Sequence, residues 1–474
     1  MSEFVNRDDD LAQLRSLYRS DSATLAVMWG RRRVGKTRLL TESIRNREDA
    51  VYYQATETTA TDQLTEFRKT AARQFPEVSH VERAWEPLLR SLTDRDAIIV
   101  LDEFPYLADA DSSLPSIIQR LWDHDVKGSA ATLVLSGSSI GMMYELTLDG
   151  TAPLYGRISQ QPSGKFPIEP LDFADAVRFV PSYDSTTQVV AYAIFGGVPH
   201  YLQAIDESET VGENVTRTLL DQRGSLHEEP ELLLRMEFDE VSRYFAILKA
   251  IAAGNRTRNE IATAVGIDAN SSSYYLDRLE DLALLEPVTP VTADPVRSRN
   301  RRYRICDRLF TFWFRFVYGQ DGRFELYGED AYAELVEPEL ADYVSPVFES
   351  LCRKAVPSLY GDLTFATLPG RWWYKHHEID VVGLTTGDTL VAGEVKYTSQ
   401  PVGYDVLARL KEEVRRIDWT PSGGGEPTYE FALFSRNGFT QSVVEAAEKD
   451  DRLRLFSLDD VVSSLNAPSS SAHD

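Results

Sequence analysis

Residues 25–40 have the types and the spacing that phosphate chemistry requires. They read LAVMWGRRRVGKTRLL, so an apolar run leads into Gly30, and a helix is expected to open after Lys36 and Thr37. Gly30 and Gly35 permit backbone angles and close approaches that a Cβ atom would block. The loop can therefore turn successive backbone N–H groups inward and form an anion site at a helix N-terminus.

Lys36 and Thr37 supply the chemistry of this loop. The pattern G-x-x-x-x-G-K-S/T places an ammonium where it reaches the β- and γ-phosphates of a nucleotide, and a hydroxyl where it can bind Mg²⁺. The alternative is a chance glycine-rich turn, which the strand before the loop and the helix after it disfavour. The predicted nucleotide-binding residues here are Gly30, Arg31, Arg32, Arg33, Val34, Gly35, Lys36, Thr37 and Arg38.

Two acids end a second apolar run. Residues 97–101 read AIIVL, which is typical of a strand buried in a parallel sheet, and Asp102 and Glu103 follow directly. Open α/β sheets bind ligands at the carboxyl ends of their strands. We therefore expect Asp102 to hold Mg²⁺, directly or through water, and Glu103 to polarise the attacking water. The simpler interpretation is a pair of acids in a turn after a strand.

Three further residues are candidates for the same chemistry. Residues 132–135 (TLVL) predict another buried strand, followed by Ser136 and Ser138, whose hydroxyls can contact the γ-phosphate or align water. Serines in such places also serve as helix caps. Arg157 precedes a strand expected at 158–166 and can stabilise transition-state charge in its own or a neighbouring subunit. Its structural alternative is a surface salt bridge.

A second group of acids, with one lysine, lies near the C-terminus. Glu394 and Lys396 are two residues apart at the strand expected at 389–395, so both project from one face. Asp380, on the preceding strand, can share a Mg²⁺ ion with Glu394 through hard oxygen ligands, and Glu349 on a helix can complete the metal shell. Lys396 can position water or stabilise a developing phosphorane charge. Alternatively, the acids and the lysine are merely paired in a domain that binds proteins.

The middle of the chain has the pattern of a helix-turn-helix. Helices are expected at 240–253, 259–265 and 271–282, with a short turn containing Gly266 and a strand at 284–288. This order predicts a winged helix, in which the third helix would read DNA.

Five arginines follow in an otherwise acidic protein. They are Arg297, Arg299, Arg301, Arg302 and Arg304. In a winged helix this segment forms part of the wing, which can lie on DNA phosphates. Winged helices also serve as protein-contact modules, and arginines can pair with an acidic surface, so both interpretations stay open. The aromatic segment 305–318 predicts core or interdomain packing.

Composition limits the class of protein. The chain has 474 residues, a net charge of −24 and 50 basic residues, of which ten are lysines. This balance argues against general coating of nucleic acid, though not against a local basic patch. It resembles the composition of proteins from salt-loving archaea; the alternative is an ordinary acidic protein. Two cysteines without metal-site spacing, a polar acidic N-terminus and the lack of a long apolar run predict a cytoplasmic protein with no membrane span.

The elements that must position these residues divide the chain into segments. We expect a nucleotide-binding core at 1–168, a helical lid at 169–235, the winged helix and aromatic segment at 236–318, a polar linker at 319–333, an α/β domain at 334–466 and a disordered tail at 467–474. The last domain is expected to have an αβββαβ-type order of elements.

An ordered set of motifs resembles one known family. FVNRDDDL, WGRRRVGKTRLL, LDEFPYL, LSGSS, PLYGR and FGGVPHYL occur in this order over about the first 205 residues. In them the chain is similar to the archaeal ATPase family of AAA+-like and STAND-like P-loop proteins. The resemblance implies a parallel αβα ATPase core of five strands with a helical lid, ATP and Mg²⁺ as cofactors, and a finger-like role for Arg157.

The region from about 335 to 460 resembles the PD-(D/E)xK nuclease superfamily. It has the form of the uncharacterised C-terminal domain that commonly follows ATPases of this family. The ordered set of Glu349, Asp380, Glu394 and Lys396 carries the resemblance, although the usual proline is replaced where the chain reads EID. The resemblance implies a restriction-endonuclease-like α/β domain.

Two functions are consistent with this organisation. In the first, an ATPase uses its nucleotide state to control a DNA-binding winged helix and a Mg²⁺-dependent deoxyribonuclease. In the second, a STAND-type signalling ATPase uses its last two domains to bind proteins and does not cleave DNA. A homo-oligomer is required if Arg157 acts on a neighbouring subunit.

Overall fold

The chain forms two compact units. The computed structural model describes residues 7–126, 128–159, 164–238, 241–295, 297–298 and 300–467. The first unit comprises Met1–Pro170, Val198–His200 and Asp281–Ala283, and the second comprises Leu171–Gly197, Tyr201–Glu280 and Leu284–Asp474. Arg299 and residues 468–474 of the predicted tail lie outside the described residues. All segments predicted after residue 170 therefore fall mainly within the second unit.

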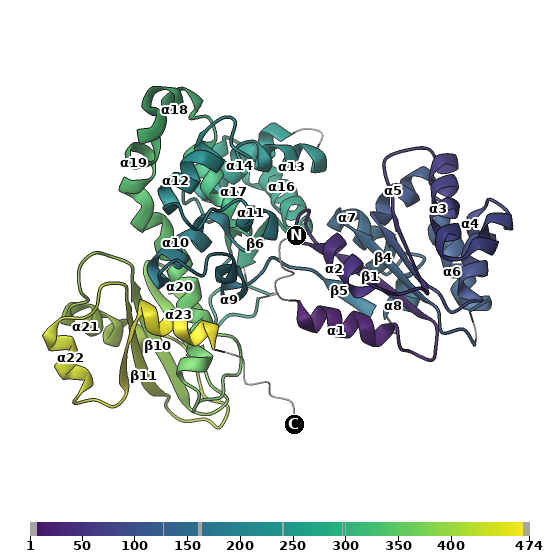
Figure 1. Cartoon of the computed structure of the whole chain (residues 1–474). Helices are drawn as coiled ribbons and strands as arrows, with labels where there is room; N and C mark the ends of the chain where they lie inside the picture. The colour runs from purple at the N-terminus through teal and green to yellow at the C-terminus, as the bar shows by residue number, and fades with distance from the viewer. Residues whose placement is uncertain are drawn as a thin grey trace. The chain divides into compact units, whose positions relative to one another are not determined.

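The first unit is built on a parallel five-stranded sheet with the order β2-β3-β4-β1-β5 (Figure 1). Its strands are β1 (Thr24–Trp29), β2 (Ala50–Gln54), β3 (Ile98–Asp102), β4 (Thr132–Gly137) and β5 (Lys165–Pro167). Its helices are α1 (Asp8–Leu17), α2 (Lys36–Ser43), α3 (Ala60–Gln74), η1 (Pro76–His80), α4 (Trp85–Thr93), α5 (Phe104–Ala110), α6 (Leu114–His124), α7 (Ile140–Met143), η2 (Tyr144–Leu148) and α8 (Tyr155–Ser159). The parallel core that the motifs implied is confirmed.

Alternating side chains of the strands bury two opposite faces. Ala26 and Met28 of β1 pack with apolar residues of α1 and α2. Leu25 and Val27 of the same strand pack with residues of α3 to α8. The sheet is thus the middle layer of an αβα sandwich, since the side chains of a strand point alternately to its two faces. The strand expected at 158–166 is wrong in its first part, where α8 continues to Ser159.

Helices dominate the first part of the second unit. They are α9 (Phe173–Ala176), η4 (Val177–Phe179), α10 (Ser185–Phe195), α11 (Pro199–Leu202), α12 (Val211–Val215), η5 (Thr216–Leu220), α13 (Glu229–Glu237), α14 (Val241–Ala252), α15 (Arg258–Val265) and α16 (Ala269–Asp281). Pro199 and His200 of α11 are assigned to the first unit. An antiparallel pair, β6 (Leu285–Val288) and β7 (Arg302–Ile305), follows α16.

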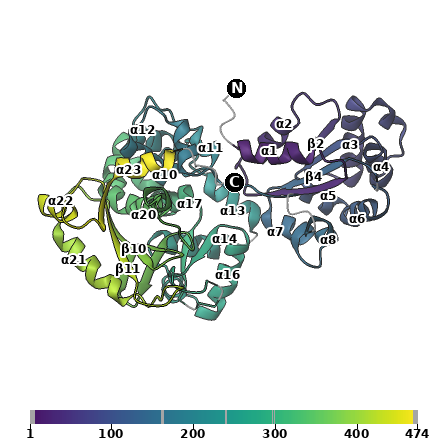
Figure 2. The same cartoon turned by 90° about the horizontal axis from the view of Figure 1, so that it is seen from below.

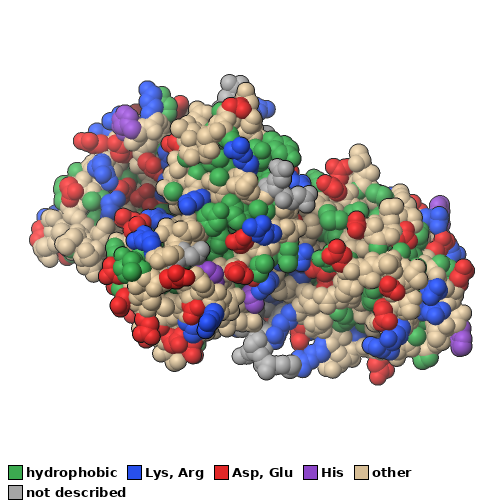
Figure 3. Space-filling model, turned by 90° about the horizontal axis from the view of Figure 1, so that it is seen from above, with side chains coloured by type: hydrophobic (Ala, Val, Ile, Leu, Met, Phe, Trp, Pro, Cys, Tyr) green, Lys and Arg blue, Asp and Glu red, His purple; other side chains and the backbone are tan. Residues whose placement is uncertain are grey.

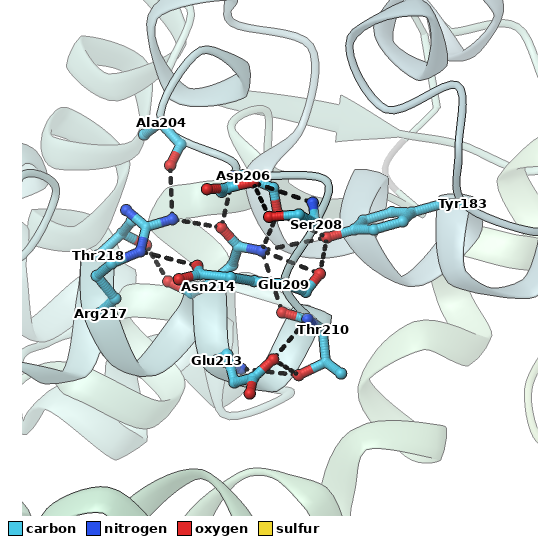
Figure 4. A network of polar contacts seen from close by, with 10 residues as sticks. All are labelled: Tyr183, Ala204, Asp206, Ser208, Glu209, Thr210, Glu213, Asn214, Arg217 and Thr218. Carbon is cyan, nitrogen blue, oxygen red and sulfur yellow. Dashed lines mark hydrogen bonds and ion pairs between the residues drawn. The ribbon is translucent and has the colours of Figure 1, made fainter.

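A buried asparagine organises the loop before α12 (Figure 4). Asn214 is fully buried, and its Nδ2 donates to the Tyr183 hydroxyl at 3.1 Å and to the carbonyls of Asp206 at 2.8 Å and Thr210 at 3.1 Å. Its Oδ1 accepts from the backbone N–H of Asp206 at 2.8 Å and from Arg217 at 2.6 Å. This one side chain thereby forms hydrogen bonds with the loop and with residues on both sides of it.

We expect Asn214→Ala to destabilise this part of the chain strongly. The substitution removes the hydrogen bonds of a fully buried side chain to partners that are partly buried. Each such bond contributes about 0.5–1.5 kcal/mol net, so we expect a decrease of about 3 kcal/mol in the free energy of unfolding. Urea denaturation measures it. Ser208→Ala, an exposed position of the same loop, is the control and should cost less than about 0.5 kcal/mol. Equal losses in the two variants would contradict the assigned role of Asn214.

The second unit ends in helices and a mixed sheet. The helices are α17 (Arg308–Phe312), η6 (Trp313–Val317), α18 (Asp321–Tyr327), η7 (Gly328–Asp330), α19 (Ala331–Leu335), η8 (Glu337–Glu339), α20 (Leu340–Leu359), α21 (Tyr404–Glu413), η9 (Val414–Arg416), α22 (Gln441–Ala447) and α23 (Leu458–Asn466). The strands are β8 (Gly370–Tyr374), β9 (His377–Leu384), β10 (Thr389–Lys396), β11 (Thr428–Ser435) and β12 (Leu453–Ser457).

This second sheet has the order β12-β11-β10-β9-β8. The pairs among β8, β9 and β10 are antiparallel, and those among β10, β11 and β12 are parallel. Figure 2 shows α21 and α22 on one side of β10 and β11, with α20 and α23 on the other. The order from α20 to β11 is the αβββαβ order that the sequence predicted.

Two other predictions have clear outcomes. The segment expected as a polar linker at 319–333 forms α18, η7 and the start of α19. The aromatic segment packs as predicted, with Phe310, Phe312 and Phe314 almost completely buried.

Acidic side chains, interspersed with lysine and arginine, are spread over the face in Figure 3. Within the described ranges, none of the helices has the length and apolar character needed to cross a membrane.

Candidate functional site

The loop between β1 and α2 depends on its two glycines. A Cβ atom on Gly30 would collide with the carbonyl oxygen of Ile168, just after β5. Gly35 caps α2 with a φ of 100°, in the left-handed region that other residues rarely adopt. The glycines therefore allow the close approach and the turn that direct the loop to the N-terminus of α2.

Lys36 is the first residue of α2, and its side chain folds back into this loop. Its ammonium donates to the carbonyl oxygens of Gly30 at 2.6 Å and Arg31 at 2.9 Å, and the residue is 4% exposed. The positive charge is thus held beside the N-terminus of α2, whose backbone N–H groups also favour an anion. The arrangement suits the binding of phosphate groups.

Thr37 and Asp102 meet although 65 positions separate them in the sequence. The Thr37 hydroxyl donates to Asp102 Oδ2 at 2.7 Å, and Asp102 is fully buried at the end of β3. A hydroxyl and a carboxylate oxygen side by side are hard ligands of the type that Mg²⁺ prefers. The donor set therefore fits a Mg²⁺ ion that binds together with nucleotide phosphates.

Tyr52 belongs to the same cluster, although no motif in the sequence identifies it as a site residue. It lies on β2, and its hydroxyl donates to the same Asp102 Oδ2 at 2.8 Å. Burial, followed by the negative charge of Asp102, raises the pKa of Tyr52 well above its usual value. The phenol therefore stays protonated and remains a hydrogen-bond donor at neutral pH.

Glu103 contacts one of the two candidate serines. Its Oε1 accepts from the Ser138 hydroxyl at 2.6 Å, and its Oε2 accepts from the Ser138 backbone N–H at 3.2 Å. Glu103 has a φ of 55°, an uncommon backbone conformation for this residue type. Ser136 is instead fully buried within β4, and its hydroxyl has no hydrogen-bond partner in the described part of the chain. Ser138 is thus the serine that positions the acid.

Arg7 is a second residue that the sequence did not single out. Its guanidinium donates to the carbonyl oxygens of Val34 at 3.2 Å and Glu169 at 2.5 Å, and it lies 3.3 Å from Asp10. Val34 is itself fully buried. Arg7 therefore connects the start of α1 to the loop between β1 and α2 through a hydrogen bond.

The four arginines predicted to line the loop differ in their surroundings. Arg31 and Arg32 are half-buried, and Arg32 donates to the Tyr106 hydroxyl at 3.4 Å. Arg33 and Arg38 are exposed, and Arg33 has a left-handed φ of 68°. Their contacts with a nucleotide remain predictions.

Arg157 lies in a surface ion pair. It projects from α8, and its Nε donates to Asp123 Oδ1 at 2.7 Å while Nη2 bonds the other carboxylate oxygen. Both side chains are about one-third exposed. This geometry is the structural alternative considered for Arg157, and its role in hydrolysis remains a prediction.

In the second unit, Glu394 and Asp380 are surrounded by donors. Glu394 Oε1 accepts from Lys396 at 2.7 Å and from Arg409 of α21 at 2.6 Å. Asp380 Oδ2 accepts from the backbone N–H of Val395 at 3.1 Å. Burial, then the nearby Glu394 carboxylate, raises the pKa of Asp380. The predicted Asp380, Glu394 and Lys396 are thus brought together at the ends of β9 and β10.

An unpredicted arginine lies among the carboxylates. Arg371 of β8 forms ion pairs with Glu349 and, at 2.9 Å, with Glu378, and it is 3.9 Å from Asp380. The described residues contain no group of three or more histidine, cysteine or acidic side chains that could hold a metal ion. The predicted shell of Glu349, Asp380 and Glu394 is therefore not assembled, because guanidinium groups already neutralise its carboxylates.

Arg302, expected on a wing, is engaged with the second sheet. Its Nη1 lies 3.1 Å from both carboxylate oxygens of Glu378, and its guanidinium stacks over Trp373 at 4.4 Å from the ring centroid. Of the other described arginines of the segment, Arg297 and Arg304 are exposed and Arg301 is half-buried. Arg304 pairs with Glu286 across the hairpin, Arg301 donates to a backbone carbonyl at 3.3 Å, and the Arg297 side chain is 89% exposed.

Two families match this chain. Residues 4–205 match a family described as an ATPase domain predominantly from Archaea. Residues 313–416 match a family described as Archaea bacterial proteins of unknown function. The first match contains the loop, Asp102 and Glu103, and the second contains the carboxylates of the mixed sheet.

Individual relatives extend these matches. The uncharacterized protein MJECL04 of Methanocaldococcus jannaschii is 32% identical over 393 residues, which cover 81% of this chain and 85% of that protein. The Walker-type ATPase PABY2304 of Pyrococcus abyssi is 18% identical, with a TM-score of 0.49 over 66% of this chain and 96% of that one. A RuvB variant of Thermotoga maritima is 14% identical, with a TM-score of 0.31 over 60% and 90%. Both structural similarities are too distant to support a functional argument.

Proposed function

The chain belongs to the archaeal ATPase family, and from this premise we propose that it binds ATP with Mg²⁺ and hydrolyses it in the first unit. The observation that carries the proposal is the 2.7 Å hydrogen bond between Thr37 and Asp102, which joins the phosphate-binding loop to the end of β3. Calorimetric titration with ATP and Mg²⁺ tests it. One nucleotide per chain is expected, and the absence of binding would overturn the proposal.

Each residue has a defined task in this mechanism. The loop N–H groups and Lys36 bind the phosphates and neutralise their charge. Thr37 and Asp102 would hold Mg²⁺, which would supply charge neutralisation to the phosphates. Glu103 orients a water molecule and accepts its proton, while Ser138 holds the Glu103 carboxylate in place. We keep Arg157 as a candidate for transition-state stabilisation, which requires that it leave Asp123.

The second part of the proposal concerns DNA. Helices α14 to α16 and the hairpin β6–β7 have the order of a winged helix, and α16 presents Tyr274, which is 67% exposed. Arg297, Arg301 and Arg304 are the described cations that we propose for phosphate contacts. Arg302 instead fixes the hairpin to the mixed sheet through Glu378. In this proposal the nucleotide state controls how the winged helix meets DNA.

The mixed sheet is the second candidate site. The convergence of Asp380, Glu394 and Lys396 at β9 and β10 favours a nuclease-like role in DNA cleavage. The carboxylates as placed do not fit a Mg²⁺ shell, because Arg371 and Arg409 bind them, and we assign no metal-dependent step to them. The alternative is a signalling ATPase whose second unit binds proteins and leaves DNA intact.

DNA cleavage separates these two functions. The purified protein is incubated in high salt with Mg²⁺ or Mn²⁺, with and without ATP, on duplex, branched and single-stranded DNA. If the domain is a nuclease, we expect Glu394→Ala to reduce cleavage at least about a hundredfold, while Glu445→Ala, an exposed acid of α22, leaves it unchanged. A changed rate in Lys36→Ala would indicate control by the nucleotide. No cleavage by the wild type, with ATP hydrolysis intact, would favour the signalling function.

A further inference from the structure

We infer that Tyr52 is a positioning residue of the proposed nucleotide site, whose hydroxyl fixes the Asp102 carboxylate and thereby sets the affinity for Mg²⁺ in the Mg²⁺–nucleotide complex. The inference rests on the proposed function, because it assigns Asp102 to the ion. It adds a residue from β2 to a site otherwise formed by the loop before α2, the first turn of α2 and the ends of β3 and β4.

The sheet itself places Tyr52 against the acid. Strands β2 and β3 are parallel neighbours, with Tyr52 opposite Val100 and Gln54 opposite Asp102. From this register the phenol extends along the sheet, and its hydroxyl lies 2.8 Å from Asp102 Oδ2. The same oxygen accepts from Thr37 at 2.7 Å.

Asp102 is thus anchored at both oxygens. Its Oδ1 accepts from the backbone N–H of Glu103 at 3.1 Å, and Oδ2 accepts from the two hydroxyls. A fully buried carboxylate requires such donors, because an unpaired buried charge is strongly destabilising. Thr37 belongs to the first turn of α2, directly after the loop that is proposed to meet the phosphates, whereas Tyr52 belongs to the sheet. Tyr52 therefore supplies the anchor that does not depend on the conformation of the loop.

The neighbouring tyrosine provides a matched control. Tyr53 is the next residue of the same strand, and it packs in the core on the opposite face of the sheet. Its hydroxyl donates to Gln63 Oε1 at 2.5 Å, away from Asp102. Phenylalanine at either position removes one tyrosine hydroxyl from β2, but only Tyr52→Phe removes a donor to Asp102.

The experiment measures binding of a fluorescent ATP analogue as a function of free Mg²⁺. For Tyr52→Phe we expect the Mg²⁺ concentration at half-maximal binding to rise about tenfold, the factor that one hydrogen bond of ordinary net strength represents. The affinity for the analogue in EDTA should stay within about threefold of wild type. Tyr53→Phe should match the wild type in both measurements.

Each other outcome overturns the inference in a recognisable way. If Tyr52→Phe has the Mg²⁺ dependence of the wild type, its hydroxyl does not position Asp102 for the ion. If Tyr52→Phe loses affinity equally with Mg²⁺ and with EDTA, its role is structural. If the wild type itself binds no nucleotide, the proposed function fails together with the inference.

Discussion

Replacement of Lys36 by alanine is expected to weaken the binding of Mg²⁺–ATP by at least about a hundredfold. The ammonium is buried inside the loop and bonded to the Gly30 and Arg31 carbonyls, so it is held where phosphates would bind. A hydrogen bond to a charged group is worth about 1.5–3 kcal/mol, and a contact with two phosphates therefore accounts for such a loss. Isothermal titration calorimetry at high salt measures the affinity.

Lys69→Ala is the matched control for this variant. Lys69 is an exposed lysine of α3 in the same unit, and it pairs with Glu66 at 3.3 Å. Its removal changes the net charge by the same amount and should leave the affinity within about twofold of wild type. Comparable losses in both variants would mean that general charge, and not the loop, determines binding.

Glu103→Gln is expected to slow ATP hydrolysis by about 10²–10⁴-fold while nucleotide affinity stays within about threefold. An amide cannot accept the proton of the attacking water, and general bases contribute rate factors of this size. Glutamine retains the side-chain shape and one oxygen that can accept from Ser138. Phosphate release in a single turnover, together with calorimetric binding, separates the chemical step from the binding step.

The control for Glu103→Gln is Glu86→Gln. Glu86 lies on α4 and forms ion pairs with Arg90 and Arg120 on the surface of the same unit. Its hydrolysis rate should equal that of the wild type. Hydrolysis at the wild-type rate in Glu103→Gln would remove this residue from the mechanism, and a parallel loss of affinity would indicate a role in binding.

The arrangement of the candidate nucleotide site was predictable because most of its residues belong to short motifs in the sequence. Lys36 and Thr37 directly follow the glycine-rich loop, and Asp102 directly follows an apolar run that is typical of a buried strand. Tyr52 was not predictable in the same way. Its contact with Asp102 depends on which strand lies beside β3, and the sequence YY offers two tyrosines that point to opposite faces.

The second unit shows a different limit of what can be predicted from the sequence. The order of its helices and strands follows from hydrophobic patterning, and Asp380, Glu394 and Lys396 converge as their strands require. Arg371 and Arg302 reach the acids through long side chains from β8 and from the hairpin. Sequence spacing does not reveal such tertiary ion pairs, and they decide whether the carboxylates remain available to a metal ion.

The measurement that tests the central claim most directly is release of inorganic phosphate from ATP by the wild type and by Lys36→Ala. Both proteins are assayed in the same high-salt buffer, with Mg²⁺ and with EDTA. We predict Mg²⁺-dependent turnover by the wild type and only background release by Lys36→Ala. Equal release by both proteins, or no release by a folded wild type that binds Mg²⁺–ATP, would contradict ATP hydrolysis at this site.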